Sequence, residues 1–116
     1  MEQAIQIEIL KKDFQDIQPI LQVIGDETRQ LILLVLMEAS CKVGMRVGEI
    51  TERTHLSRPA VSHQLRILKD SGLVHMREEG TKNYYFISVS ENRHQFCKLQ
   101  KLLTDLGTLM DGLEEG

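Results

Sequence analysis

Apolar residues recur at helical spacing near both ends of the chain. In residues 10–24 they stand four, three, four and three positions apart, as on one face of an α-helix: Leu10, Phe14, Ile17, Leu21 and Ile24. Pro19 lies inside this stretch, so we expect a kink or a restart there. In residues 91–113 apolar residues alternate at three and four positions, which is typical of a helix packed along a partner helix.

The segment between these stretches predicts three more helices and a hairpin. Asp26 or Thr28 can cap a helix that is apolar nearly all round and is therefore expected to be central. Residues 47–71 then predict two short helices joined by a tight turn.

The second of these short helices has clear start and stop signals. Ser57 can cap it, Pro59 falls in its first turn, and Gly72 ends it. Residues 73–89 predict a β-hairpin with a turn over residues 79–83. We therefore expect a mainly α chain with a small hairpin wing: one winged helix-turn-helix domain over residues 1–116.

Charge is segregated along the chain. The formal net charge is -3, but residues 42–82 sum to +3 and hold three of the four histidines. No acidic residue occurs from Ser57 to Lys69. A basic segment between acidic flanks indicates a polyanionic partner, because the flanks discourage indiscriminate binding.

The basic segment has two distinct helical faces. At about 100° per residue, Val61, Leu65 and Leu68 fall together and should face the core. The opposite face can hydrogen-bond phosphate or base edges. An ordinary solvated basic face is the alternative. The expected DNA contacts are Ser57, Arg58, Pro59, Ser62, His63, Gln64, Arg66 and Lys69, with Arg77 and Lys82 on the hairpin.

Three segments together resemble the winged-helix repressors of the ArsR/SmtB family: "VIGDETRQLILLVL", "VGEITERTHLSRPAVSHQLRILKDSGLV" and "REEGTKNYYFI". The resemblance covers roughly Ile17 to Val89. It implies a homodimer formed by the terminal helices, a recognition helix over Ser57 to Ser71, and repression of a near-palindromic operator that an inducer relieves. Relatives often have His where this chain has Gln64, so their base preference is not carried over.

The resemblance also directs attention to sensor sites. Thiol-type metal sensors of the family have Cys-x-Cys at the position where this chain reads "RVGEI". A second metal site of the family would fall on Asn92, His94, Asp105 and Thr108, and of these only His94 is a good ligand. We expect no metal and no cofactor. Cys41 and Cys97 are a candidate redox sensor, with two inert thiols as the alternative.

The two terminal stripes predict a homodimer, because a small chain cannot easily bury both alone. Packing of both stripes within the monomer is the alternative. The residues expected at the interface are Leu10, Phe14, Ile17, Leu21, Phe96, Leu99, Leu103, Leu106 and Met110, within dimerisation helices 10–24 and 91–113.

Other classes of protein fit the sequence less well. There is no Gly-rich phosphate loop, no GxSxG and no cluster of ligands, so we do not expect an enzyme. No apolar run spans a bilayer and no basic signal peptide begins the chain, so we expect no membrane partner and a cytoplasmic location. The prediction is a sequence-specific DNA-binding repressor; a winged-helix protein-interaction module without specific DNA binding is the alternative.

Overall fold

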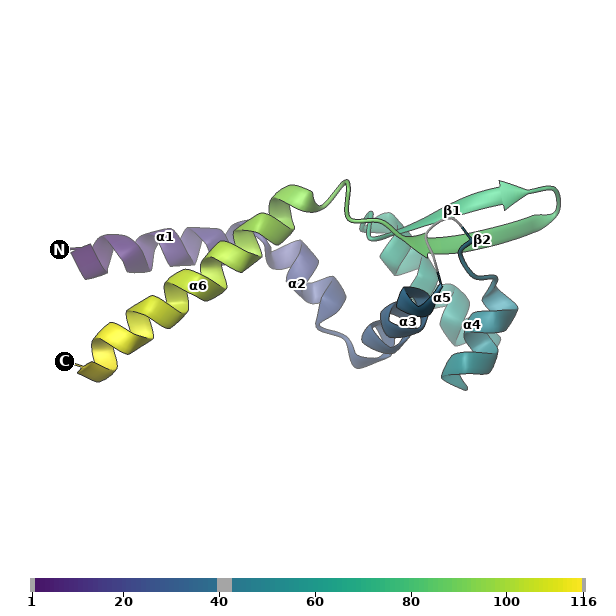
Figure 1. The fold of residues 1–116 in the computed structure, drawn as a ribbon, viewed down its shortest axis with the longest axis horizontal. Coiled ribbons are helices and arrows are strands. Elements are labelled where there is room, and N and C mark those ends of the chain that lie inside the picture. Colours follow the sequence, from purple (N-terminus) through teal and green to yellow (C-terminus); the bar gives the residue numbers. More distant parts are fainter. Residues whose placement is uncertain (1, 40–42, 116) are drawn as a thin grey trace. The chain divides into compact units, whose positions relative to one another are not determined.

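The computed structural model describes residues 2–39 and 43–115, which form two compact units. One unit comprises residues 1–20 and 93–116, and the other comprises residues 21–92. The observed helices and the hairpin make the fold mainly α with a two-stranded wing, as predicted (Figure 1). That the whole chain behaves as a single domain stays a prediction.

The unit of residues 21–92 is built on three helices: α3 (Glu27–Glu38), α4 (Val47–Thr54) and α5 (Arg58–Asp70). Their inward residues are almost inaccessible to solvent: Ile32, Leu36, Ile50, Val61, Leu65 and Leu68. Burying each such aliphatic side chain contributes roughly 1.5–3 kcal/mol relative to leaving it exposed. These residues are the core that fixes the orientation of α5.

The central position predicted for α3 is only partly correct. Asp26 caps this helix by accepting a hydrogen bond from the Arg29 backbone N–H at 2.9 Å, as one of the two predicted capping residues. One face is buried, but Leu34 and Met37 are 60% and 66% exposed. A helix that is apolar all round buries only the faces that neighbours cover.

Local signals define both ends of α5. Ser57 accepts a hydrogen bond from the Ala60 N–H, and Pro59 lies in the first turn, where its missing N–H removes no helical bond. After Asp70 the chain leaves the helix through Gly72, whose φ is +86°. A Cβ there would lie 2.6 Å from Glu91 Oε2, the end of a flexible side chain that could shift, so glycine is required here by its backbone conformation.

The hairpin consists of β1 (Val74–Glu79) and β2 (Lys82–Ile87), paired antiparallel from Val74 with Ile87 to Glu79 with Lys82. The turn is therefore two residues long, whereas the sequence predicted a five-residue turn over residues 79–83. Gly80 has a φ of +63°, which allows so tight a turn and frees Lys82 and its neighbour to extend β2. Met45 also exchanges two backbone hydrogen bonds with Tyr85, each 2.8 Å, and ties the preceding loop to the wing.

In the other unit, α1 (Glu2–Asp16) packs against α6 (Arg93–Glu115). The helices run antiparallel, with both chain termini at the same end of the unit (Figure 1). Their shared core is formed by Leu10, Ile17, Ile20, Leu102 and Leu109. The helix predicted over residues 10–24 begins earlier than predicted, at Glu2. The restart predicted at Pro19 is confirmed: the helix breaks at Ile17 and continues as α2 (Gln18–Ile24), with Pro19 in its first turn.

Candidate nucleic-acid interface

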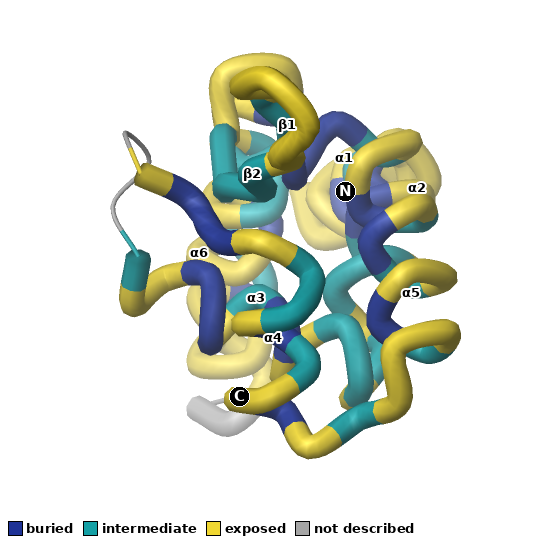
Figure 2. The backbone as a smooth tube through the Cα atoms, turned by 90° about the vertical axis from the view of Figure 1, so that its right-hand side faces the viewer, coloured by how far each residue is buried: buried dark blue, intermediate teal, exposed yellow. Residues whose placement is uncertain are grey.

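The outward face of α5 carries the polar side chains that the sequence pointed to. Ser62, His63 and Arg66 are exposed, while Val61, Leu65 and Leu68 are at most 1% exposed on the other side of the helix. Figure 2 shows this alternation of exposed and buried segments along α5. The predicted core face of this helix is confirmed, and its opposite face offers a hydroxyl, an imidazole and a guanidinium to a partner.

Further polar and cationic residues stand at the two ends of α5. Ser57, Arg58 and Pro59 are exposed at its start and Lys69 is exposed at its end. Within residues 2–39 and 43–113, no carboxylate lies within ion-pair distance of Arg58, Arg66 or Lys69. These three side chains thus form no ion pair there and can meet phosphate.

Gln64 differs from its neighbours because its side chain is already engaged. Its Oε1 accepts a hydrogen bond of 3.0 Å from Arg29 Nη1, and Gln64 is half-buried. Arg29 also donates to the backbone oxygens of Val23 at 2.8 Å and Gln22 at 3.0 Å. Sequence reasoning missed Arg29, which ties the end of α2 to α5, because nothing in its position singled it out from the other cations of the first third of the chain.

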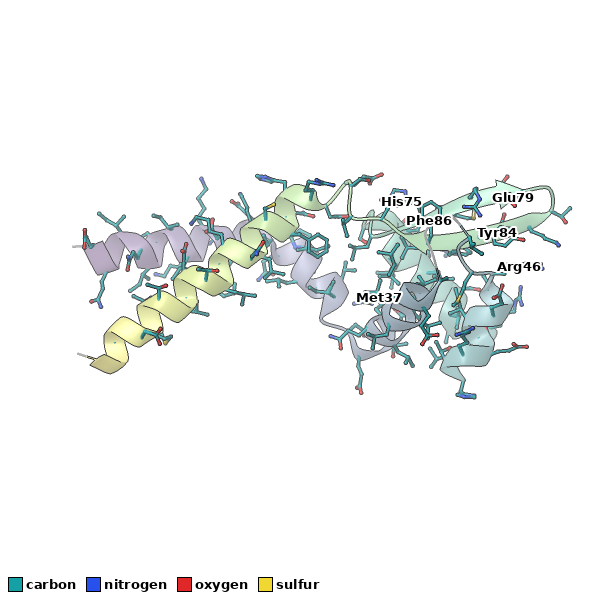
Figure 3. The ribbon with its side chains drawn as sticks, in the orientation of Figure 1. Met37, Arg46, His75, Glu79, Tyr84 and Phe86 are labelled. Carbon is teal, nitrogen blue, oxygen red and sulfur yellow. The ribbon has the colours of Figure 1, made fainter. Side chains whose placement is uncertain are left out.

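Arg77 on the wing is also held by the protein itself. Its Nη2 donates to the Val43 backbone oxygen at 2.9 Å, and its Nε donates to Glu79 Oε1 at 2.7 Å. The guanidinium lies over the rings of Tyr84 and Phe86, 5.4 Å and 6.0 Å from their centroids. Figure 3 labels both aromatic residues and Glu79 on the hairpin. These contacts favour a role in shaping the wing, and a DNA contact by Arg77 stays a prediction.

Lys82, at the start of β2, is exposed and pairs with no carboxylate in the part of the chain that the structure describes. Near it, the side chains of Arg46, Arg58 and Asn83 line a cleft of about 370 Å³. Sequence reasoning treated Arg46 only as the place of a missing metal ligand. Nothing in the chain's periodicity indicated that the loop before α4 meets the tip of the wing.

The residues predicted at a dimer interface divide by exposure. Leu10 and Ile17 are buried within the unit of α1 and α6. Leu21, Phe96, Leu99 and Leu106 are half-buried, and Phe14, Leu103 and Met110 are 40%, 59% and 44% exposed. Part of the predicted seam is therefore used inside the monomer, and part remains available to a partner.

Ion pairs join α1 to α6. Lys98 Nζ donates to Asp16 Oδ2 at 2.7 Å, and this hydrogen bond holds the pKa of Asp16 below its ordinary value of 3.8. Lys101 donates to Asp105 at 2.7 Å and lies 3.7 Å from Asp13, and its pKa is raised above 10.5, chiefly by the bond to Asp105. Each pair is partly exposed and screened by solvent.

The structure describes one of the two candidate sensor cysteines. Cys97 is exposed, and Cys41 lies outside the described residues. The ammonium of Lys98 is paired with Asp16, as above. In residues 2–39 and 43–115, no three His, Cys, Asp or Glu side chains gather as a metal site would require. Asn92 instead donates to the Ser71 backbone oxygen at 3.1 Å, and Thr108 donates to that of Thr104.

Comparisons with known proteins identify this arrangement. The profile described as "Bacterial regulatory protein, arsR family" matches residues 26–76, from the cap of α3 into β1. An HTH-type transcriptional regulator of Methanocaldococcus jannaschii is 39% identical over 80 residues, which are 69% of this chain and 85% of that protein. The chain belongs to the ArsR family.

Other similar proteins are transcription regulators by name or share the fold. The transcriptional activator HlyU of Vibrio cholerae is 31% identical, with 72% of this chain and 73% of HlyU covered. The transcriptional repressor SdpR of Bacillus subtilis is 31% identical, with 61% and 74% covered. An ArsR-like regulator from a Rhodococcus species shares the fold at a TM-score of 0.69 and 20% identity, covering 88% of this chain and 90% of that one.

The ArsR-family chain is thus a DNA-binding transcription regulator with a winged helix fold, and not an enzyme. DNA is the partner of this family. Among the described residues, no helix is both long enough and apolar enough to cross a membrane.

Proposed function

We propose that this chain is a homodimeric repressor whose two α5 helices read a near-palindromic operator and which an inducer releases. The observation that carries this proposal is the outward face of α5, where Ser62, His63 and Arg66 are exposed opposite a fully buried apolar face. A helix positioned by its own core and polar on its outer side is suited to enter the major groove.

The residues of this face have two roles in the proposal. Ser62, His63 and Arg66 contact base edges, because they stand in the middle of the exposed face and carry groups that match base donors and acceptors. Phosphates are contacted by the residues at the margins of the face and on the wing: Ser57, Arg58, Lys69 and Lys82. Gln64 and Arg77 support these elements through the intramolecular bonds described above.

Dimerisation through α1 and α6 is supported by apolar side chains that their mutual packing leaves uncovered. On α1 these are Ile5 and Ile9, 60% and 45% exposed, and on α6 they are Leu103, Met110 and Leu113, 59%, 44% and 52% exposed. Regulators of this size rarely leave large apolar patches in water. Dimeric helix-turn-helix proteins read half-sites about one DNA turn apart, or about 34 Å, and a second copy that covers these side chains would supply the second reading helix.

Repression rather than activation is the direction that we propose, although the relatives include both an activator and a repressor by name. For the inducer, the exposed thiol of Cys97 supports release by an oxidant or electrophile, because such a sensor must be accessible. Replacement of Cys97 by Ser should then abolish oxidant-induced release from DNA. An unchanged response in Cys97→Ser would remove this thiol from the switch.

The test of the proposed function is fluorescence anisotropy of the reduced protein on DNA from upstream of its own gene and on a scrambled duplex. At about 150 mM salt, a specific regulator should bind the upstream DNA roughly a thousandfold more tightly. Transcription in vitro from that DNA should then fall as protein is added. Equal weak binding to both duplexes would contradict sequence-specific recognition.

A further inference from the structure

A cleft of about 370 Å³ opens where three segments of residues 21–92 meet. Its walls come from Arg46 and the α4 helix that follows it, from the first residue of α5 and from the tip of the wing. Arg46, Gly48, Glu49, Glu52, Arg58 and Asn83 are among the residues that line it. Figure 3 labels Arg46 beside α4, below the outer half of the hairpin.

In the part of the chain whose side chains the structure describes, neither arginine of this cleft forms an ion pair. Both are exposed, and no carboxylate of residues 2–39 or 43–113 lies within 4.0 Å of either guanidinium. The Arg46 side chain makes no capping bond to α4. Arg58 Nη1 lies 4.0 Å from the point where a Cβ on Gly48 would stand, so this guanidinium reaches back over the start of α4. Cationic donors from two elements thus line one space.

We infer that this cleft holds one phosphate group of the DNA backbone, bound between Arg46 and Arg58, with Asn83 on the wing side. The inference rests on the proposed binding of DNA through α5. Arginine forks suit phosphate because their planar N–H groups can bond two of its oxygens at once. A phosphate held here joins α5 to the wing and fixes how the unit sits on the duplex.

The acidic residues in the cleft favour the DNA backbone over a free anion. Glu49 and Glu52 line the same space, so their two negative charges balance the two positive charges of the arginines. A multiply charged free phosphate gains little from a neutral cleft, because the carboxylates repel it. A phosphodiester carries one negative charge and is delivered by the other contacts of α5. The position of Arg58, the first residue of α5, places the cleft directly beside the proposed DNA-reading face.

The experiment compares Arg46→Ala with Arg53→Ala by anisotropy over a series of salt concentrations. Arg53 is the matched control: it is an exposed arginine on the same helix, but it pairs with Glu38 and does not line the cleft. Arg46→Ala should weaken binding to upstream and scrambled DNA alike by about tenfold. It should also reduce the slope of log K against log salt by about 0.9. Arg53→Ala should change both quantities little.

Two further arms locate the phosphate. In the double variant Arg46→Ala/Arg58→Ala, the loss should be smaller than the product of the single losses, because both side chains hold one group. Single methylphosphonate substitutions in the upstream duplex should reveal one position whose neutralisation weakens binding by the wild type more than binding by Arg46→Ala, in which only Arg58 still holds that phosphate. Thermal unfolding of each variant, expected near that of the wild type, separates these losses from misfolding.

The outcomes distinguish this inference from the proposed function. If the wild type prefers its upstream DNA but Arg46→Ala has the same affinity and salt slope as Arg53→Ala, the cleft does not hold a backbone phosphate. In that case only this inference is wrong. If the wild type shows no preference, the proposed function fails and this inference fails with it. Arg46-dependent thermal stabilisation by inorganic phosphate, measured against chloride at equal ionic strength, would overturn the assignment to DNA in favour of a small-anion site.

Discussion

Helices α5 and α6 are both amphipathic, but their apolar faces are buried to different extents. The apolar face of α5 is buried within its own unit, with Val61, Leu65 and Leu68 at most 1% exposed. On α6, Leu102 and Leu109 are buried, but Leu103 and Met110 remain 59% and 44% exposed. Helix α5 packs against three elements of its own chain, which hold its polar face in a fixed position. Helix α6 packs mainly against α1 and therefore retains an exposed apolar surface that a partner can cover.

The largest effect should come from the buried face of α5. Replacing Leu65 by Ala removes most of a side chain that is 1% exposed and leaves a cavity, which should cost about 2–5 kcal/mol of unfolding free energy. Urea denaturation followed by circular dichroism measures this loss. Leu65→Met, which nearly conserves volume, should cost less than about 1.5 kcal/mol. Equal stability of Leu65→Ala and the wild type would show that α5 is not fixed by this core.

The exposed apolar face of α6 should give the next largest effect. Introducing Glu at both Leu103 and Met110 would place two charges in the proposed dimer interface, which should raise the dimer dissociation constant by at least about a hundredfold. Sedimentation velocity at micromolar concentration measures this change. Thr104→Glu adds a charge to the polar side of the same helix and should leave the dimer intact. A wild type that sediments as a monomer would refute the interface.

The exposed face of α5 should show a smaller effect that depends on DNA sequence. Arg66→Ala should weaken binding to the specific site by about 1–3 kcal/mol and relax sequence preference, because a base contact is lost. Lys82→Ala should weaken all sequences alike and flatten the salt dependence, because only a phosphate contact is lost. Anisotropy on specific and random duplexes separates the two. Equal losses on both duplexes for Arg66→Ala would contradict its assignment to a base edge.

The smallest effect concerns the ion pair between α6 and α1. Because the hydrogen bond from Lys98 lowers the folded pKa of Asp16, this pair stabilises the fold fully above the unfolded value of 3.8 and less as pH falls through the lower folded value. Asp16→Asn should therefore be less stable than the wild type at pH 7, with the difference shrinking below pH 3.8. Urea denaturation at the two pH values measures it. A difference independent of pH would exclude the carboxylate charge as the cause.

Particular residues show how far the sequence could be trusted. The cap at Ser57, the early proline and the spacing of Val61, Leu65 and Leu68 were sufficient to predict α5, because these signals act within a few residues. The first eight residues of α1 were missed because Ile5, Ile7 and Ile9 do not follow one helical face. The hairpin turn was predicted too long because the positive φ of Gly80, which closes it in two residues, depends on strand pairing.

The sequence by itself determined the order of helices and hairpin and the acid-free basic face of α5, since both are encoded in local spacing and composition. The family was indicated by the resemblance of three sequence segments. Only the tertiary structure decided which cationic side chains are available. In the folded chain, Arg77 bonds to Glu79 and lies over the wing aromatics, and Arg29 donates to Gln64. Arg46 and Arg58, by contrast, line one cleft. The physical reason is distance: partners in a hydrogen bond or a shared cleft are chosen by packing between segments far apart in the chain, which periodicity does not encode.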